Sequence, residues 1–292
     1  MTDPVLIGEH LVKAFGSGHT EVRAVDDVSI AINAGEMVLI MGPSGSGKTT
    51  LVSMLGGLLK PTAGRVQIDG TDITSLSEAQ LPRVRAHKIG FVFQAFNLLE
   101  ALTVEENILF PARLIKGGLA AAKPRADALI DRLGLGKRRA ALPRTLSGGE
   151  KQRVAIARSL INAPPVILAD EPTGNLDSAN GQEVMMILHD VARDEGRAVI
   201  LVTHDPRVED IADRILWLED GEFRDRKAEE HSWVHDPVCG MRVDAWTAEV
   251  STELDNERYV FCSQRCRDRF LAEPARYRRA GAATGQGPTS RP

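Results

Sequence analysis

The sequence predicts an α/β fold built on a mainly parallel sheet, followed by a small α+β unit that contains every cysteine. Apolar runs typical of strands alternate with helical segments, as expected when crossover helices connect parallel strands. Two of these runs, 166–169 and 198–202, are continuously apolar, which favours strands buried on both faces. All three cysteines, Cys239, Cys262 and Cys266, lie in the last quarter of the chain, which indicates a second unit of different composition.

The length and the composition limit the classes of protein to which the chain can belong. The chain has 292 residues, enough for about two domains of ~150 residues each. Hydrophobic residues make up 43% and charged residues 26%, as in soluble globular proteins, and the net charge of -4 gives no reason to expect a nucleic-acid binder. No apolar run approaches the ~18–20 residues that cross a bilayer, and the N-terminus lacks the features of a signal peptide. We therefore expect a cytoplasmic polypeptide that meets a membrane only through a partner.

The elements follow from local patterns. Apolar residues at 5–7, 28–32 and 38–40 predict strands of an N-terminal antiparallel sheet. After Gly42 the pattern changes to alternating helices and strands. We expect helices from 47, over 103–133, from 147 and over 179–191, and strands over 89–93, 166–169 and 198–202.

The expected organisation has four parts. The larger domain covers 4–224, and a charged, aperiodic linker covers 225–231. The small domain covers 232–280. Residues 281–292 are small and polar and predict a disordered tail.

A glycine-rich loop follows the strand at 38–40 and precedes a helix. It matches the pattern G-x-x-x-x-G-K-[ST], whose glycines let the backbone approach a phosphate closely. The backbone N–H groups and the helix N-terminus attract the phosphates, Lys48 reaches the β- and γ-phosphates, and the Thr49 hydroxyl binds Mg²⁺. The expected nucleotide-binding residues here are Gly42, Pro43, Ser44, Gly45, Ser46, Gly47, Lys48, Thr49 and Thr50.

Two adjacent carboxylates end the apolar run at 166–169. Asp170 is expected to hold Mg²⁺, directly or through water, and Glu171 to polarise the attacking water. A phosphate loop needs both functions, so the acidic pair completes a candidate site for ATP hydrolysis.

The segment Leu146-Ser-Gly-Gly-Glu-Lys-Gln-Arg153 adds a third motif. Ser147 can cap a helix that begins with two glycines and leaves N–H groups exposed to an anion. Together the three motifs resemble those of the ATP-binding cassette (ABC) ATPases over roughly residues 4–224. The resemblance implies a phosphate-loop NTPase core with an antiparallel β subdomain and a helical signature subdomain. It also implies a head-to-tail homodimer in which Ser147, Gly148, Gly149 and Glu150 contact the partner's ATP.

Four further residues match family positions. By resemblance, Gln94 senses Mg²⁺ and the γ-phosphate, Asp177 lies in a loop that communicates across the dimer, and His204 contacts the γ-phosphate and orients Glu171. Phe15 matches the aromatic residue that stacks on adenine, with Phe in place of the commoner Tyr. For Phe15 the alternative is a core aromatic residue, and for His204 it is a structural residue at a strand end.

Three segments are more specific: Phe15-Gly-Ser-Gly, Gln94-Ala-Phe-Asn-Leu-Leu and Leu102-Thr-Val-Glu-Glu-Asn. Through them the chain is similar to cassettes that power lipoprotein-release and macrolide-export permeases. This implies an ATP-hydrolysing subunit docked on the cytoplasmic face of separate integral-membrane permease subunits, for export or for extrusion of lipid or lipoprotein. The alternative is a cassette that transmits a conformational signal to cell-wall or division enzymes. Both use the same motifs, so the sequence leaves the choice open.

The last quarter of the chain contains Asp236-Pro-Val-Cys239-Gly-Met241 and then Tyr259-Val-Phe-Cys262-Ser-Gln-Arg-Cys266. With these segments, residues 232–280 resemble the small YHS domain. Cys262 and Cys266 would meet at a strand-to-helix junction, and Cys239 in a turn would add a third soft ligand for Zn²⁺ or Cu⁺. The fourth ligand stays open among His235, Met241 and solvent. Alternatively, the cysteines are small hydrophobic residues of a minor core.

Overall fold

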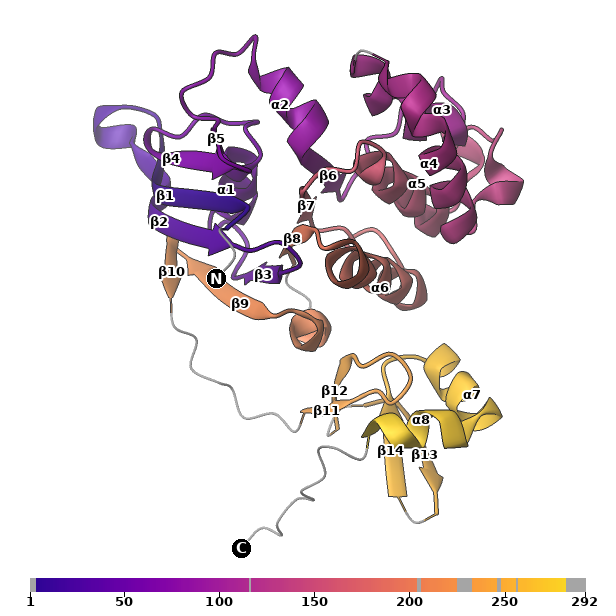
Figure 1. Ribbon diagram of the computed structural model, residues 1–292. Coiled ribbons are helices and arrows are strands. Elements are labelled where there is room, and N and C mark those ends of the chain that lie inside the picture. The colour runs from indigo at the N-terminus through magenta and orange to yellow at the C-terminus, as the bar shows by residue number, and fades with distance from the viewer. Residues whose placement is uncertain are drawn as a thin grey trace, which may run out of the picture. The chain divides into compact units, whose positions relative to one another are not determined.

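The computed structural model describes residues 4–115, 117–203, 206–224, 233–245, 248–255 and 257–281 (Figure 1). The chain divides into two compact units, one of residues 1–204 and 212–226 and the other of residues 205–211 and 227–292. The expected linker and all but the first residue of the expected tail lie outside the described residues. Within the described part, no helix combines the length and apolar character needed to cross a bilayer.

A six-stranded sheet forms the centre of the first unit in the described part of the chain, in the order β10-β9-β3-β8-β7-β6. Neighbouring strands from β9 to β6 run parallel, and β10 closes the sheet as an antiparallel hairpin with β9. The strands are β3 (Met37–Met41), β6 (Ile89–Phe93), β7 (Val166–Asp170), β8 (Ala198–Val202), β9 (Arg214–Glu219) and β10 (Glu222–Arg224). The predicted α/β class is confirmed.

The second sheet of this unit is antiparallel, in the order β2-β1-β4-β5. Its strands are β1 (Leu6–Phe15), β2 (Val22–Ile32), β4 (Ala63–Ile68) and β5 (Thr71–Asp72). The expected strands at 5–7 and 28–32 belong to it, but the placement of 38–40 in the same sheet was wrong. Those residues lie in β3, which pairs parallel with β8 and β9. All five β3 residues are buried, because the strand is covered on both faces.

Helices fill the space around the two sheets. Helix α1 (Lys48–Leu55) contributes Leu51 and Leu55 to a core that includes residues of both sheets. The other helices of this unit are α2 (Leu81–Lys88), α3 (Val104–Leu109), α4 (Gly118–Arg132), α5 (Gly148–Leu160) and α6 (Ser178–Glu195). Figure 1 shows α3, α4 and α5 gathered on the opposite side of β6 and β7 from α1 and the antiparallel sheet. In this unit, β6 and β7 therefore separate these three helices from the antiparallel sheet.

The helices of the structure differ from the predicted ones in two places. The single region over 103–133 is divided into α3, a 3-10 turn over Pro111–Leu114, and α4. Proline begins the turn, and Gly117 before α4 has a left-handed φ of 72°, so one continuous helix cannot form. Helix α2 was not predicted, because its short, charged sequence, LPRVRAHK, carries little apolar periodicity.

The second unit is a small α+β fold, as predicted. Its described residues form two hairpins and two helices, together with a 3-10 segment, Pro206–Ile211. The hairpin strands are β11 (Trp233–His235), β12 (Arg242–Asp244), β13 (Val250–Leu254) and β14 (Glu257–Phe261), and the helices are α7 (Gln264–Ala272) and α8 (Pro274–Gly281). The Phe270 ring packs against Tyr259 and Phe261, with ring centroids 4.6 and 5.3 Å away.

Candidate functional site

The phosphate loop connects β3 to α1, and at two of its glycines the surrounding backbone leaves no room for a side chain. Gly42 and Gly47 have φ of 147° and 102°, where side chains are strained. A Cβ at Gly42 would lie 1.9 Å from the carbonyl oxygen of Leu218, and one at Gly47 would lie 2.0 Å from that of Ala24. The loop therefore takes its shape from close contact with two backbone segments that are distant in sequence.

Lys48 is held by the loop that precedes it. Its ammonium donates hydrogen bonds to the carbonyl oxygens of Gly42 and Pro43, at 2.9 and 2.7 Å. The side chain is 8% exposed, and burial lowers the pKa of Lys48, while the charges of Glu171 and Asp170 oppose that shift. The predicted phosphate-binding cation therefore lies at the loop, close to the predicted magnesium ligand Asp170 and the predicted catalytic residue Glu171.

The remaining loop residues differ in exposure. Pro43, Ser44 and Gly45 are exposed at the tip of the loop, whereas Ser46 is buried and Thr50 is half-buried in the first turn of α1. The exposed tip is the part that a ligand can approach.

Thr49 and Asp170 come together from different motifs. The Thr49 hydroxyl donates to Oδ1 of Asp170 at the end of β7, at 3.3 Å. Burial raises the pKa of Asp170, and the hydrogen bond from Thr49 opposes the shift. Hydroxyl and carboxylate oxygens are ligands that Mg²⁺ prefers, so these residues fit the predicted ion.

Glu171 has a strained backbone. Its φ is 48°, in the left-handed region that non-glycine residues rarely occupy, at a cost of roughly 1–3 kcal/mol. The Glu171 N–H donates to the carbonyl of Val202 at 2.9 Å, and the Gly174 N–H donates to the Glu171 carbonyl at 3.1 Å. These bonds hold the residue at the end of β7, next to Asp170. Strain of this kind is typical of functional positions.

Gln94 lies against the loop that follows β7, at Gly174 and Asn175. It follows β6, the neighbour of β7, and its carbonyl accepts a hydrogen bond from the Asn175 amide at 2.8 Å. A Cβ at Gly174 would lie 2.7 Å from Nε2 of Gln94, so the side chain fills the space beside this glycine. Gln94 and Glu171, both predicted to act in hydrolysis, therefore lie at the same loop, the one that follows β7.

The signature residues begin α5 with a capping box, which confirms the predicted cap. The Glu150 N–H donates to the Ser147 hydroxyl at 3.3 Å, and the Ser147 N–H donates to Glu150 at 2.8 Å. Arg138 also donates to Glu150, at 2.8 Å. The backbone N–H of Ser147 lowers the pKa of Glu150, so the cap carries a carboxylate.

The signature packs against the loop that precedes α6 and against the first turn of that helix. A Cβ at Gly149 would lie 2.2 Å from Oδ1 of Asn180, and one at Gly148 would lie 3.3 Å from Leu176. Asp177 caps α6 by accepting the Asn180 N–H at 2.9 Å. Sequence reasoning missed Asn180, which could have been suggested by its place three residues after the capping Asp177.

Phe15 ends β1, and 46% of its surface is exposed. The alternative that it is a core aromatic residue is therefore wrong. The Lys13 ammonium lies 5.3 Å from the ring centroid. His204 lies outside the described residues, and Thr203 before it is buried, with its N–H donating to Ile40 at 3.4 Å.

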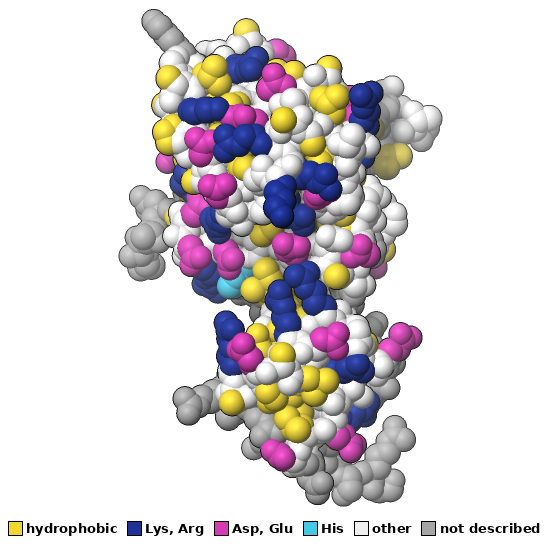
Figure 2. All heavy atoms as spheres, turned by 90° about the vertical axis from the view of Figure 1, so that its right-hand side faces the viewer, with side chains coloured by type: hydrophobic (Ala, Val, Ile, Leu, Met, Phe, Trp, Pro, Cys, Tyr) yellow, Lys and Arg dark blue, Asp and Glu magenta, His cyan; other side chains and the backbone are white. Residues whose placement is uncertain are grey.

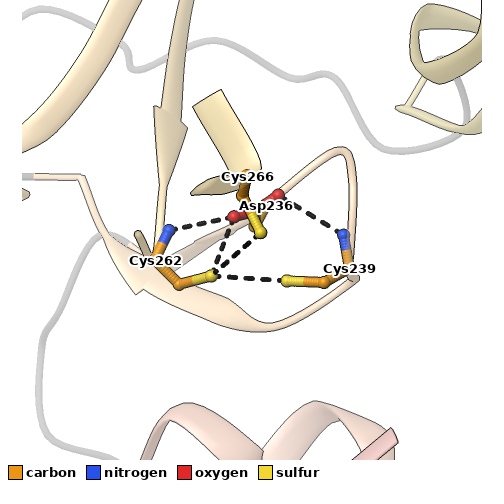
Figure 3. Close-up of side chains that lie close together, drawn as sticks. All are labelled: Asp236, Cys239, Cys262 and Cys266. Atoms are coloured by element: carbon orange, nitrogen blue, oxygen red, sulfur yellow. Dashed lines mark hydrogen bonds between the residues drawn. The ribbon is translucent and has the colours of Figure 1, made fainter. Parts of the chain in front are cut away.

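A second site lies in the C-terminal unit, where the three cysteines converge (Figure 3). Cys262 Sγ is 3.3 Å from Cys239 Sγ and 3.7 Å from Cys266 Sγ. Cys239 lies in the turn after β11, Cys262 follows β14, and Cys266 is in α7, so the expected turn and strand-to-helix junction are confirmed.

The cluster contains a carboxylate that sequence reasoning missed. Oδ2 of Asp236 accepts hydrogen bonds from the thiol and the N–H of Cys262, both at 2.9 Å. Among the described residues, the ligand atoms of Asp236, Cys239, Cys262 and Cys266 all lie within 4.8 Å of one another, and His235 is not in this group. The spacing D-x-x-C, with Asp236 three residues before Cys239, was the available signal.

Hydrogen bonding and burial shape the acidity of this cluster. The Cys239 and Cys262 thiols lower the pKa of Cys266, which favours the thiolate at the start of α7. Contacts with Cys239 and Cys266 raise the pKa of Cys262, and burial raises that of Asp236. Three thiols and one carboxyl group thus lie close together. Thiolate sulfur atoms are the ligands that thiophilic metals prefer.

The first site has the parts of a phosphate-loop nucleotide-binding ATPase, and comparisons with known proteins identify its class. The family model described as ABC transporter matches residues 25–174. The chain belongs to this family, and its larger unit is an ABC ATPase cassette. A model of the YHS domain matches residues 234–280.

Curated relatives match the cassette. The macrolide export ATP-binding/permease protein MacB of Bartonella henselae is 47% identical over 221 residues, which cover 76% of this chain and 33% of that protein. MacB of Rhodospirillum rubrum is 48% identical over 211 residues, covering 72% and 32%. The chain therefore spans about a third of the length of the curated relatives that it matches.

Solved structures match the same region. A dimeric ATP-binding cassette in a post-hydrolysis state, bound to ADP and Pi, has a TM-score of 0.68 and 39% identity, and covers 77% of this chain and 99% of that chain. CbiO1 from Clostridium perfringens, part of an ABC transporter complex, has a TM-score of 0.66 and 29% identity, and covers 76% and 88%.

Proposed function

We propose that this chain is the ATP-hydrolysing subunit of an ABC transporter and that it energises integral-membrane permease subunits. The observation that carries the proposal is the contact of Thr49 with Asp170, which joins the phosphate loop to the strand end where Glu171 lies. The macrolide-export names of the relatives support export as the form of transport.

The residues of one protomer have separate tasks in the proposed reaction. The N–H groups of the loop and Lys48 bind the β- and γ-phosphates of ATP, and Thr49 and Asp170 hold Mg²⁺, which neutralises phosphate charge when bound. Glu171 accepts a proton from the water that attacks the γ-phosphorus. Phe15 stacks on the adenine, and Gln94 and His204 position the water and the γ-phosphate.

A homodimer completes the site. The signature glycines Gly148 and Gly149 begin α5 and approach Leu176 and Asn180, respectively, and Figure 1 shows α5 beside α3 and α4. The phosphate loop packs instead against the backbone at Ala24 and Leu218. The dimeric state of the ADP-bound neighbour supports an arrangement in which the signature of each protomer contacts the other's ATP.

An apolar groove beside Gln94 is the proposed docking site for the permease. An open pocket of about 420 Å³ lies between β6, α2 and the turn after α3, and Phe91, Phe93, Leu99, Phe110 and Leu114 contribute to its lining. Leu114 is 66% exposed. A helix of the membrane partner with an apolar face is the proposed occupant of this groove, and the proposed complex lies on the cytoplasmic face of the membrane, where ATP is available.

The surface of the helical flank does not suggest nucleic acid as the partner. On the face drawn in Figure 2, basic and acidic side chains of the described residues are interspersed. The net charge of the chain is -4. A nucleic-acid binder instead gathers its lysines and arginines on one surface.

Copurification from detergent-solubilised native membranes tests the docking proposal. The tagged full-length chain is expected to retain a multispanning permease, and the pair, reconstituted in vesicles, to couple ATP turnover to transport. Leu114→Glu is expected to lose the permease, whereas Leu119→Glu, at an exposed α4 position that does not line the groove, is expected to retain it. Equal recovery with both variants would contradict the docking site, and ATP turnover without transport would favour a signalling complex.

We also propose that the C-terminal unit binds a metal ion through Cys239, Cys262 and Cys266. The convergence of three cysteine side chains supports this, since their sulfur atoms lie close together and form no disulfide. A unit of this size has a small core, and a bound metal stabilises such folds.

A further inference from the structure

We infer that Asp236 is the fourth ligand of the metal at Cys239, Cys262 and Cys266, completing a tetrahedral site for a divalent ion such as Zn²⁺. This inference rests on the proposed metal binding by the cysteines and adds the ligand that the sequence left open. It further assigns the site a ligand that Zn²⁺ uses and Cu⁺ does not.

The positions of the four ligand atoms fit one ion. With Zn–S near 2.3 Å and Zn–O near 2.0–2.2 Å, the ligand atoms of a tetrahedral site lie roughly 3.5–3.8 Å apart. In the cluster, the sulfur of Cys262 is 3.3 and 3.7 Å from the other two sulfurs and 2.9 Å from Asp236. All four ligand atoms lie within 4.8 Å of one another. Small side-chain rotations therefore suffice to place them around a common centre.

The carboxylate of Asp236 is buried and held in orientation. It is 1% exposed. Oδ1 accepts the N–H groups of Val238 and Cys239, at 2.8 and 3.4 Å, and Oδ2 accepts the N–H of Cys262 at 2.9 Å. Oδ2 has two lone pairs, and the second one accepts the Cys262 thiol at 2.9 Å. This lone pair becomes available to a metal when the thiol loses its proton to bind the same ion. Hydrogen bonds that fix a ligating carboxylate are a general feature of metal sites.

The surrounding elements also favour an ion at this point. Cys266 is the third residue of α7, where the positive end of the helix stabilises a thiolate. Figure 3 shows Asp236 and the three cysteines directed towards one another from the turn, the end of β14 and the first turn of α7. A metal would therefore link all three segments.

The hard carboxylate oxygen defines which ions use the complete site. Zn²⁺ is borderline in softness and accepts both thiolate and carboxylate, whereas Cu⁺ prefers thiolate and thioether ligands. A Cu⁺ ion bound at the same cysteines would depend on sulfur alone. Removal of the Asp236 charge should thus affect the two metals differently.

Metal titration of the full-length protein tests the inference. The chain has three cysteines, all in this cluster, so a thiolate-to-Co²⁺ charge-transfer band reports on this site alone. Asp236→Asn keeps the shape and an acceptor oxygen but removes the charge. We expect it to lower Zn²⁺ and Co²⁺ affinity by at least about tenfold and to change Cu⁺ affinity by less than about twofold. Asp268→Asn, at an exposed position of α7, is the matched control and should leave all three affinities unchanged.

Asp236→Cys gives an independent readout that does not depend on affinity. If residue 236 ligates the ion, four thiolates replace three, and the Co²⁺ charge-transfer absorbance per ion should rise by about one third. Unchanged absorbance, or an equal loss of Zn²⁺ and Cu⁺ affinity in Asp236→Asn, would assign Asp236 a structural role and overturn the inference. Failure of the wild-type chain to bind Co²⁺ or Zn²⁺ would instead contradict the proposed metal binding itself.

Discussion

The Thr49 hydroxyl and the Asp170 carboxylate are hydrogen-bonded at 3.3 Å, although 121 positions separate them in the chain. The contact joins the first turn of α1 to the end of β7, and it brings together the two oxygens predicted to hold Mg²⁺. The assembly of the ATP site therefore depends on the parallel sheet, because β3 and β7 are both aligned by β8.

Loss of the Asp170 charge should separate nucleotide binding from its dependence on Mg²⁺. We expect Asp170→Asn to bind ATP through the phosphate loop but to hydrolyse it more than about 100-fold slower, because a metal ligand is lost. Calorimetric titration with ATP, with and without Mg²⁺, and a phosphate-release assay measure both effects. Asp220→Asn, at an exposed turn, serves as the control. Mg²⁺-dependent turnover at the wild-type rate in Asp170→Asn would argue against the assigned ligand.

A methyl group at Gly42 should disrupt the phosphate loop. The added Cβ would lie 1.9 Å from a backbone oxygen that cannot rotate away, so Gly42→Ala should lower the free energy of unfolding by about 3 kcal/mol or more and abolish ATP binding. Gly196→Ala is the matched control. It has a φ of 64° and no atom within 4 Å of the new Cβ, so it should cost about 1 kcal/mol and leave ATP binding intact. Urea unfolding and nucleotide titration distinguish these outcomes.

Mixed dimers test the shared site. Lys48→Ala removes the phosphate-binding cation of one protomer, and Gly148→Glu places a negative charge where the partner's γ-phosphate is proposed to lie. Each variant alone should be inactive, because both composite sites are damaged. A mixture should recover up to about a quarter of the wild-type rate, since half of random dimers are mixed and hold one intact site. An inactive mixture of demonstrated heterodimers would place the signature outside a shared site.

The sequence predicted the parts of the ATP site better than their surroundings. The loop at Gly42, the carboxylates at Asp170 and Glu171 and the cap at Ser147 were recognisable because local chemistry requires those residue types at those spacings. The pairing of β3 depends on contacts with β8 and β9, more than 150 positions away, and no local pattern reports it.

The C-terminal cluster was predicted in part for the same reason. Clustered cysteines are recognisable in a sequence as candidate metal ligands, whereas Asp236 resembles an ordinary turn residue before a proline. Only the fold brings its carboxylate to Cys262, 26 positions later. The contact between Gly149 and Asn180 was likewise missed, because it depends on how α5 and α6 pack.

We expect hydrolysis of ATP between two protomers to depend on the Glu171 carboxylate, and the Glu171→Gln variant removes its negative charge. The measurement is phosphate release together with the oligomeric state in the presence of ATP and Mg²⁺, with Glu78→Gln, at an exposed position, as the control. We expect Glu171→Gln to bind ATP, to form a stable dimer that retains it, and to release phosphate at least about 100-fold slower than wild type. A variant that remains monomeric with ATP, or that turns over at the wild-type rate, would contradict this expectation.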